Sequence, residues 1–202
     1  MSSSRAQCPG PDDWPPLGTG ILWNGLFVKT YSISGCNCEV GWCSRTLADG
    51  TVQVIIEYVT QDGTSPCNAF PPDQLIKYAA QDVMADPDVI CAFPAVPKCS
   101  EGTTTSFDLI LTNCWNMVGL GFPQPNGHYD HYRFRPCTQT QACYKQCKVC
   151  CDNTTIPPTV QWSDCHYNIF MGYGAIPCAE APQDLFSWLP GICYSIGHCG
   201  GW

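Results

Sequence analysis

The chain has 202 residues and a net charge of −8, because 17 Asp and Glu residues outnumber nine Lys and Arg. This balance argues against a nucleic-acid partner, which needs a basic face to neutralise phosphates, and no apolar run reaches the roughly 18 residues of a membrane span. The 17 cysteines approach the content of a disulfide scaffold and predict an oxidising, extracellular or cell-surface location.

The length suits one large domain with a sizeable core. Charged residues make up only 13% of the chain, and Gly and Pro number 18 each. The surface must therefore carry mostly uncharged polar groups, and turns must be frequent. This composition predicts a loop-rich but folded chain.

Residues 1–20 predict an extended N-terminal arm, because prolines and small polar residues surround Cys8 and Trp14. Such a segment makes few contacts with itself. It is either a plain loop tied down by Cys8 or an arm that lies on another copy of the chain.

The next segments have strand patterns. Residues 21–34 predict a first strand and residues 51–60 the strongest one, with Val52, Val54 and Ile56 on one face. The other face of this second strand is mixed in character. We therefore expect a half-buried strand in an antiparallel sheet.

A helix is predicted over residues 73–85. Asp73 follows two prolines and suits the N-cap position, and Asp86 before Pro87 should end the helix. The apolar stripe consists of Leu75, Ile76, Ala79 and Val83.

Strand patterns return in the second half of the chain, where the second and third of four segments are expected to be joined by a turn. The four segments are 107–112, 129–135, 144–149 and 159–163. Residues 166–202 are irregular, with one helical turn near 184–188. The sequence as a whole predicts a single, mostly β, α+β domain over residues 21–202, built from a disulfide-rich antiparallel sheet or sandwich with one helix and extended termini.

Cys143, Cys147, Cys150 and Cys151 crowd into one predicted strand, and two chemistries fit them. A zinc site would combine the CxxC at 147–150 with a second pair such as Cys165-His166. Disulfides are favoured, because adjacent cysteines are typical of disulfide proteins and the other cysteines are spread along the chain. Cys147 would then face the core, while Cys150 and Cys151 point opposite ways and link to two neighbours. No metal or other cofactor is predicted.

Because 17 is odd, at least one cysteine lacks a partner within the chain. It is either a buried free thiol or part of a bond between copies, for which the candidates near the ends are Cys8, Cys193 and Cys199. Trp14 in the arm and Trp202 at the end of the chain are predicted contacts between subunits.

One local cluster of ionisable groups has catalytic character, His128-Tyr129-Asp130-His131. It is either a surface hairpin or an acid–base or metal site, with no readable nucleophile or third ligand. No other catalytic motif stands out, so no enzyme activity is expected. Asn153-Thr154-Thr155 matches the N-glycosylation sequon, which makes Asn153 a candidate glycan site.

The leading functional hypothesis is a structural subunit of an extracellular filament, sheath or layer, which associates with copies of itself through its termini or strand edges. Two alternatives stay open: a secreted carbohydrate-binding module that stacks Trp and Tyr on sugars, and a secreted hydrolase with two carboxylates. The first residues lack the apolar segment of a signal peptide. Export then requires either a signal peptide that has been removed, or release of the protein by lysis or as part of a particle. The third alternative is a hyperthermophilic source, in which intracellular disulfides are tolerated.

Overall fold

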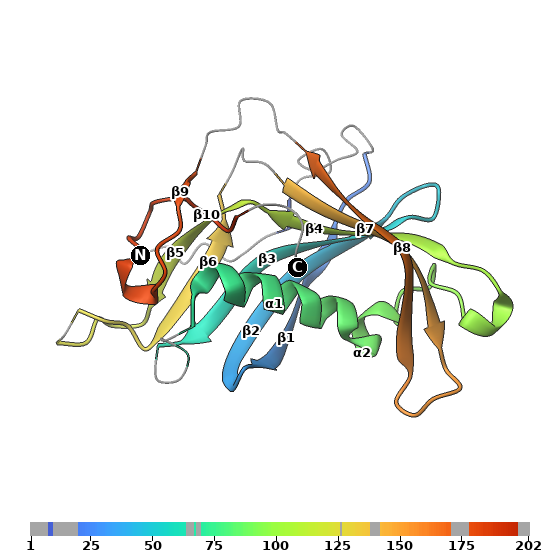
Figure 1. Cartoon of the computed structure of the whole chain (residues 1–202), viewed down its shortest axis with the longest axis horizontal. Coiled ribbons are helices and arrows are strands. Elements are labelled where there is room, and N and C mark those ends of the chain that lie inside the picture. The colour runs from blue at the N-terminus through green and yellow to red at the C-terminus, as the bar shows by residue number, and fades with distance from the viewer. Residues whose placement is uncertain are drawn as a thin grey trace.

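The computed structural model describes residues 8–9, 20–63, 67, 70–125, 127–137, 142–170 and 178–197. One sheet and two α-helices form most of the described part (Figure 1). The strands are β1 (Asn24–Ile33), β2 (Cys36–Thr46), β3 (Val52–Asp62), β4 (Thr105–Thr112), β5 (Cys114–Leu120), β6 (His131–Pro136), β7 (Ala142–Asp152), β8 (Thr159–Phe170), β9 (Ala179–Glu180) and β10 (Tyr194–Ser195). The helices are α1 (Pro72–Ala85), α2 (Pro87–Ile90) and the short 3₁₀ turns η2 (Cys99–Glu101) and η3 (Leu185–Ser187).

The sheet forks at β3, because three strands pair with it. β2 runs antiparallel along one side, while the other side is shared by β4, which is parallel, and β6, which is antiparallel. One path therefore runs β1–β2–β3–β4–β7–β8, and the other continues from β3 through β6, β5, β10 and β9. The expected mostly β fold is confirmed, with antiparallel pairing except at β3–β4 and β9–β10.

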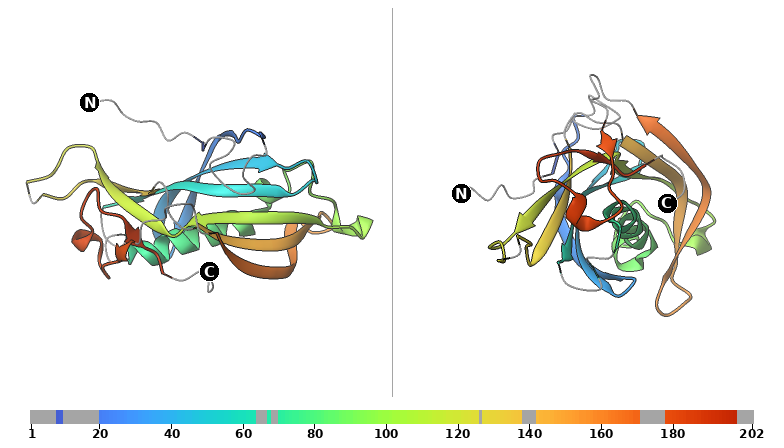
Figure 2. Two further views of the ribbon diagram at one scale, coloured as in Figure 1. Left: turned by 90° about the horizontal axis from the view of Figure 1, so that it is seen from above. Right: turned by 60° about the vertical axis from the view of Figure 1, so that its left-hand side comes forward.

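α1 lies in the concave side of the curved sheet (Figure 2). Leu75, Ile76, Ala79 and Val83 are fully buried in the main core, which confirms the predicted stripe. Burying a large apolar side chain of this kind stabilises the fold by roughly 1.5–3 kcal/mol. The helix packs against β1, β3 and β4 and so stabilises this part of the sheet.

The predicted cap of α1 is wrong. Pro71 occupies the N-cap position with extended backbone and no side-chain hydrogen bond, and Pro72 begins the helix, because its fixed φ and missing N–H suit the first helical position. Asp73 lies in the first turn, 3.9 Å from Lys77 Nζ. The predicted end is confirmed, because the helix stops at Asp86, which then caps α2.

β3 is buried on both faces rather than half-buried, which corrects the expectation from its mixed pattern. Val52, Val54 and Ile56 join the main core with α1, whereas Ile55 faces the other way. A second apolar cluster covers that outer face. It consists of Trp23, Cys43, Ile55, Ile110, Ala142 and Tyr144.

Two hairpins differ from the prediction. β6 and β7 are not neighbours, because β6 belongs to one branch of the fork and β7 to the other. β2, which the sequence did not predict, follows β1 through a turn at Ser34 and Gly35, where φ is 51° and 82°. β8 continues to Phe170 instead of ending at residue 163, so the β7–β8 hairpin is much longer than expected.

Candidate functional site

The long path of the sheet ends in two edge strands, β1 and β8. Within the described residues, β1 pairs with β2 alone and β8 with β7 alone, so each leaves one row of backbone N–H and C=O groups without a strand partner. β1 has ten residues and β8 has twelve, so both are long enough to accept another strand. Edges of this kind are where sheets from two molecules can join.

Side chains and a covalent bond fix the outer half of β8 to β7. Cys165 on β8 is bonded to Cys147 on β7, and this bond confirms that Cys147 belongs to a disulfide. Lys145 Nζ lies 5.6 Å from the centre of the Tyr167 ring, its register partner. Such a cation–π contact favours one pairing register. The edge that β8 presents is therefore rigid.

Gln146 continues this cross-strand bonding. Its Oε1 accepts a hydrogen bond from Asn168 Nδ2 and lies 3.2 Å from His166 Nε2. Its Nε2 donates to Asp108 Oδ1 on β4 at 3.0 Å. One glutamine thus connects the exposed edge strand to a buried carboxylate two strands away.

The same row of polar groups crosses the rest of the sheet. Gln53 Nε2 on β3 donates to Asp108 Oδ2 at 2.9 Å, and Arg45 Nε on β2 donates to Gln53 Oε1 at 2.8 Å. The Arg45 guanidinium is fully buried and lies 4.3 Å from the centre of the Trp23 ring. Because a buried charge must be paired and hydrogen bonded, this row satisfies polar groups inside the sheet and fixes the relative positions of five strands.

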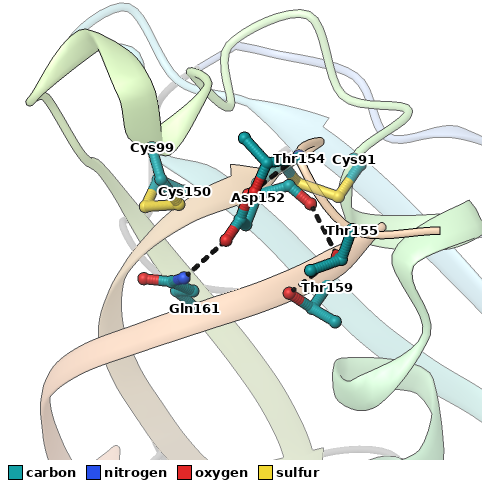
Figure 3. Close-up of a disulfide and its surroundings, with 9 residues drawn as sticks. Cys91, Cys99, Cys150, Asp152, Thr154, Thr155, Thr159 and Gln161 are labelled. Carbon is teal, nitrogen blue, oxygen red and sulfur yellow. Dashed lines mark hydrogen bonds between the residues drawn. A yellow bond between two sulfur atoms is a disulfide. The ribbon is translucent and has the colours of Figure 1, made fainter. Parts of the chain in front are cut away.

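The turn end of the β7–β8 hairpin is braced by Asp152 (Figure 3). Its Oδ1 accepts hydrogen bonds from the Thr154 backbone N–H at 2.9 Å and hydroxyl at 2.6 Å, and its Oδ2 accepts one from Gln161 Nε2 at 3.1 Å. These hydrogen bonds hold the pKa of Asp152 below its usual range, and the bond from the Thr154 hydroxyl is the largest cause.

Two disulfides tie the end of β7 to the chain that follows α2. Cys150 is bonded to Cys99 and Cys151 to Cys91, and Figure 3 shows both bonds beside the turn. The prediction that these adjacent cysteines link to two places is confirmed. Among the described residues, no group of three or more His, Cys, Asp or Glu side chains is placed to hold a metal ion.

The outer part of β8 is exposed and uncharged. Tyr167 is 38% exposed and Ile169 is 61% exposed, and residues 165–170 contain no Asp, Glu, Lys, Arg or Pro. Edge strands of soluble proteins are usually protected by such residues or by a bulge. β8 has a bulge, at Asp164 with φ 50°, but it lies at one end of this stretch and leaves residues 165–170 unprotected.

β1 is anchored differently. Lys29 Nζ lies 2.6 Å from Asp86 Oδ2 and 3.2 Å from Asp88 Oδ2, and Tyr31 Oη donates to Asp86 Oδ2 at 2.9 Å. These residues tie the inner face of β1 to the junction of α1 and α2. A charged side chain in the middle of the strand, engaged with a helix, makes this edge a poorer template for another strand.

The predicted crosslinking cysteines have partners within the chain. Cys8 is bonded to Cys43 and Cys193 to Cys137, which overturns the expectation that either joins two copies. Trp14, Cys199 and Trp202 lie outside the described residues. Spacing along the sequence could not reveal these pairs, because the fold brings distant segments together.

The free cysteine of the described part is Cys38, which is fully buried. Burial is the main cause that raises its pKa to about 12, so the thiol is neutral at physiological pH. Its Sγ lies 3.6 Å from Cys36 Sγ, which is bonded to Cys67. The buried-thiol interpretation of the odd cysteine therefore accounts for this residue.

The His128–His131 cluster lies where β5 turns into β6, as the surface-hairpin interpretation expected. His128 packs against the Phe186 ring with centroids 4.1 Å apart, while Asp130 accepts a hydrogen bond from Gln124 Nε2 at 2.6 Å. The two side chains have different partners.

Asn153 is exposed in the β7–β8 turn, and its glycosylation stays a prediction.

Comparisons with protein-family models, with curated proteins and with solved structures found no match. No helix in the described part of the chain is long and apolar enough to span a membrane. The sequence did not reveal the edge role of β8, because Gln146 on β7 carries no motif and His166 stood out only as half of the Cys165-His166 pair of the alternative zinc site. The one signal in β8 is a stretch of twelve residues without Lys or Arg, and its meaning depends on which strands pair with it.

Proposed function

We propose that this protein is a structural subunit of an extracellular assembly, and that copies join by antiparallel pairing of their β8 edges. The observation that carries the proposal is the stretch at residues 165–170, which contains no Asp, Glu, Lys or Arg, is bonded to β7, and exposes Tyr167 and Ile169. Its backbone is held in place by the bonds to β7, so little conformational entropy is lost when a second strand pairs with it.

The stretch is complementary to itself. An antiparallel register centred on Tyr167 places Cys165 opposite Ile169 and His166 opposite Asn168 of the second copy. No like charges then face each other, and Tyr167 lies opposite Tyr167 of the second copy, an aromatic cross-strand pair that favours pairing. The contact has two-fold symmetry, the commonest arrangement in homo-oligomers.

A single edge contact is small. Stable interfaces bury about 1,200–2,000 Å², more than six paired residues supply, so further contacts must add to it. β1 lies at the opposite end of the six-strand path. Lys29 makes β1 the poorer template of the two edges, so a second two-fold contact there is weaker than the β8 contact. It would extend β8-linked dimers into an open chain of molecules, because the two contacts use different surfaces.

The disulfides support the same proposal. Seven of them join pairs of described cysteines, and each restricts the unfolded chain. Such a domain persists outside the cell, where no chaperone or reductant repairs it. An extracellular location therefore belongs to the proposal.

Sedimentation velocity over a range of protein concentrations, with electron microscopy of negatively stained samples and without reductant, tests the proposal. The wild-type protein should form dimers and longer chains, and more so as salt screens the repulsion between molecules of charge −8. Ile169→Lys should remove the longer chains and leave monomers with at most β1-linked dimers, because it places a charge on the exposed β8 edge.

Ile156→Lys is the matched control. It makes the same chemical change on the same hairpin, but Ile156 is 99% exposed in the turn rather than on the edge. This variant should assemble like the wild type, and both variants should unfold at the wild-type denaturant concentration. A wild-type protein that stays monomeric at all concentrations would overturn the proposal.

A further inference from the structure

A groove of about 460 Å³ lies between the inner face of β1 and the chain that follows α2. Its volume falls in the range of small-molecule sites. Trp42 and Val89 are its buried apolar lining residues, and Phe27 and Phe93 are aromatic residues contributed by its two sides. Two further lining residues, Ala92 and Pro94, are also apolar.

An aromatic platform is exposed in this groove. Phe27 is 46% exposed, and its ring stacks on Trp42 with centroids 6.1 Å apart and planes at 23°. Phe93 is held from behind by Phe107 in the main core, at 6.4 Å between centroids. The rings are thus fixed before a ligand arrives, and a planar apolar group can pack against them without ordering loose side chains.

The groove also contains a buried polar group without a partner. Ser44 lines it and is 1% exposed, and its Oγ has no hydrogen-bond partner. A buried hydroxyl without a partner destabilises a fold, and native proteins contain few of them. A ligand that hydrogen bonds to Ser44 would account for its retention.

The electrostatics of the groove favour a cation. Lys29 and Asp88 both line it, and Lys29 Nζ lies between the carboxylates of Asp86 and Asp88. Two carboxylates against one ammonium leave this end with a net negative charge. The carboxylate of Asp88 is 84% exposed and accessible, and aromatic faces attract cations as well.

We propose that this groove binds a small aromatic ammonium compound, whose ring packs against Phe27 and whose cationic group lies near Asp88. Ser44 supplies a hydrogen bond to the bound molecule. The site is independent of the β8 edge, and its occupancy requires no assembly.

Three probes of nearly equal size test the class of ligand: phenethylammonium, phenethyl alcohol and hydrocinnamate, which are positive, neutral and negative. Titrations followed by two-dimensional NMR of the full chain should show that phenethylammonium shifts the signals of Phe27, Trp42 and Phe93. Its dissociation constant should be roughly tenfold lower than that of hydrocinnamate, with the alcohol between them. Equal binding of all three probes, or no binding, would overturn the proposal.

Two variants test the site. Phe27→Ser should abolish the shifts, while Phe122→Ser, which removes a 91% exposed ring outside the groove, should leave them unchanged. Ser44→Ala should weaken phenethylammonium binding and yet raise the denaturation midpoint of the free protein, because an unsatisfied hydroxyl has been removed. If the Ser44→Ala variant bound phenethylammonium as tightly as the wild type, the Ser44 hydroxyl would not contact the ligand, and its part in the proposal would be wrong.

Discussion

The two edge strands of the long sheet path are attached to the molecule by different means. β1 is anchored through its side chains, because Lys29 and Tyr31 reach Asp86 at the junction of the two helices. β8 is anchored through its neighbour, by the Cys147–Cys165 bond and by the polar contacts of Gln146. The first arrangement covers one face of the strand, whereas the second leaves both faces of the outer half of β8 exposed.

This difference teaches how an edge can be rigid and still available. A strand that is held by packing against a helix buries the face that packs. A strand that is ordered by bonds to one neighbour keeps its free edge and its faces. The disulfides of the β7–β8 hairpin are therefore expected to matter for the shape of the edge as well as for stability.

The largest effect should come from removing a disulfide beside the turn of this hairpin. Cys91→Ala with Cys151→Ala opens a loop of 60 residues, and chain entropy predicts a loss of roughly 4 kcal/mol in the free energy of unfolding. Cys147→Ala with Cys165→Ala opens a loop of 18 residues and should cost roughly 3 kcal/mol.

Guanidinium unfolding measures both losses, and amide hydrogen exchange locates them. The second pair should accelerate exchange in the outer half of β8 and leave β1 unchanged. Equal acceleration in both strands would show that the two edges are not held independently.

A smaller effect is expected from the anchor of β1. Asp86→Ala removes the acceptor of the Tyr31 hydroxyl and the cap of α2, and should cost about 2 kcal/mol. Asp88→Ala is the control, because its carboxylate is 84% exposed and surface pairs contribute about 0–1 kcal/mol. Denaturant unfolding gives the two values. If Asp86→Ala also accelerated amide hydrogen exchange in β8, the two edge strands would not be attached independently.

The smallest effects concern pH, and they have opposite signs at the two edges. The pKa of Asp152 is lowered, mainly by the hydrogen bond from the Thr154 hydroxyl. The turn is thus stabilised above pH 3.8, the ordinary pKa, and that contribution is lost as the pH falls through the lowered pKa of the folded state. The pKa of Lys29 is raised, mainly by its hydrogen bond to Asp86, so its contribution is present below pH 10.5 and lost as the pH rises through the raised value.

NMR titration can follow both groups in one sample. The Thr154 amide signal should move at acid pH while the ring signals of Tyr31 stay constant, and the reverse should occur in alkaline solution. Tyr31 adds to the alkaline effect, because burial is the main cause that raises its pKa. If both signals moved in the same pH range, the two edges would be coupled.

The sequence was sufficient for features that depend on local pattern. The stripe of Leu75 and Ile76 predicted α1, and the density of cysteines predicted disulfides. Both follow from rules that need no knowledge of neighbours, namely helix periodicity and the chemistry of adjacent thiols.

Features that depend on pairing could not be predicted. β3 has the pattern of a half-buried strand, yet it is buried on both faces, because the main core with α1 covers one face and the second apolar cluster covers the other. Gln146 has no motif, and its role arises because the register places it between Asp108 and His166. The groove has the same origin, since Phe27, Ser44 and Phe93 meet only after β1, β2 and α2 have packed.

The order of the disulfides along the chain has a consequence for biosynthesis. Cys8–Cys43 and Cys36–Cys67 can close once residue 67 has reached an oxidising compartment, whereas the bonds of Cys91 and Cys99 must wait for residues 150 and 151. During that early interval five thiols, those of Cys8, Cys36, Cys38, Cys43 and Cys67, compete for two bonds. The buried position of Cys38 resolves the competition only after β2 has paired, so correct oxidation of the first third depends on a sheet whose remaining strands are still being made.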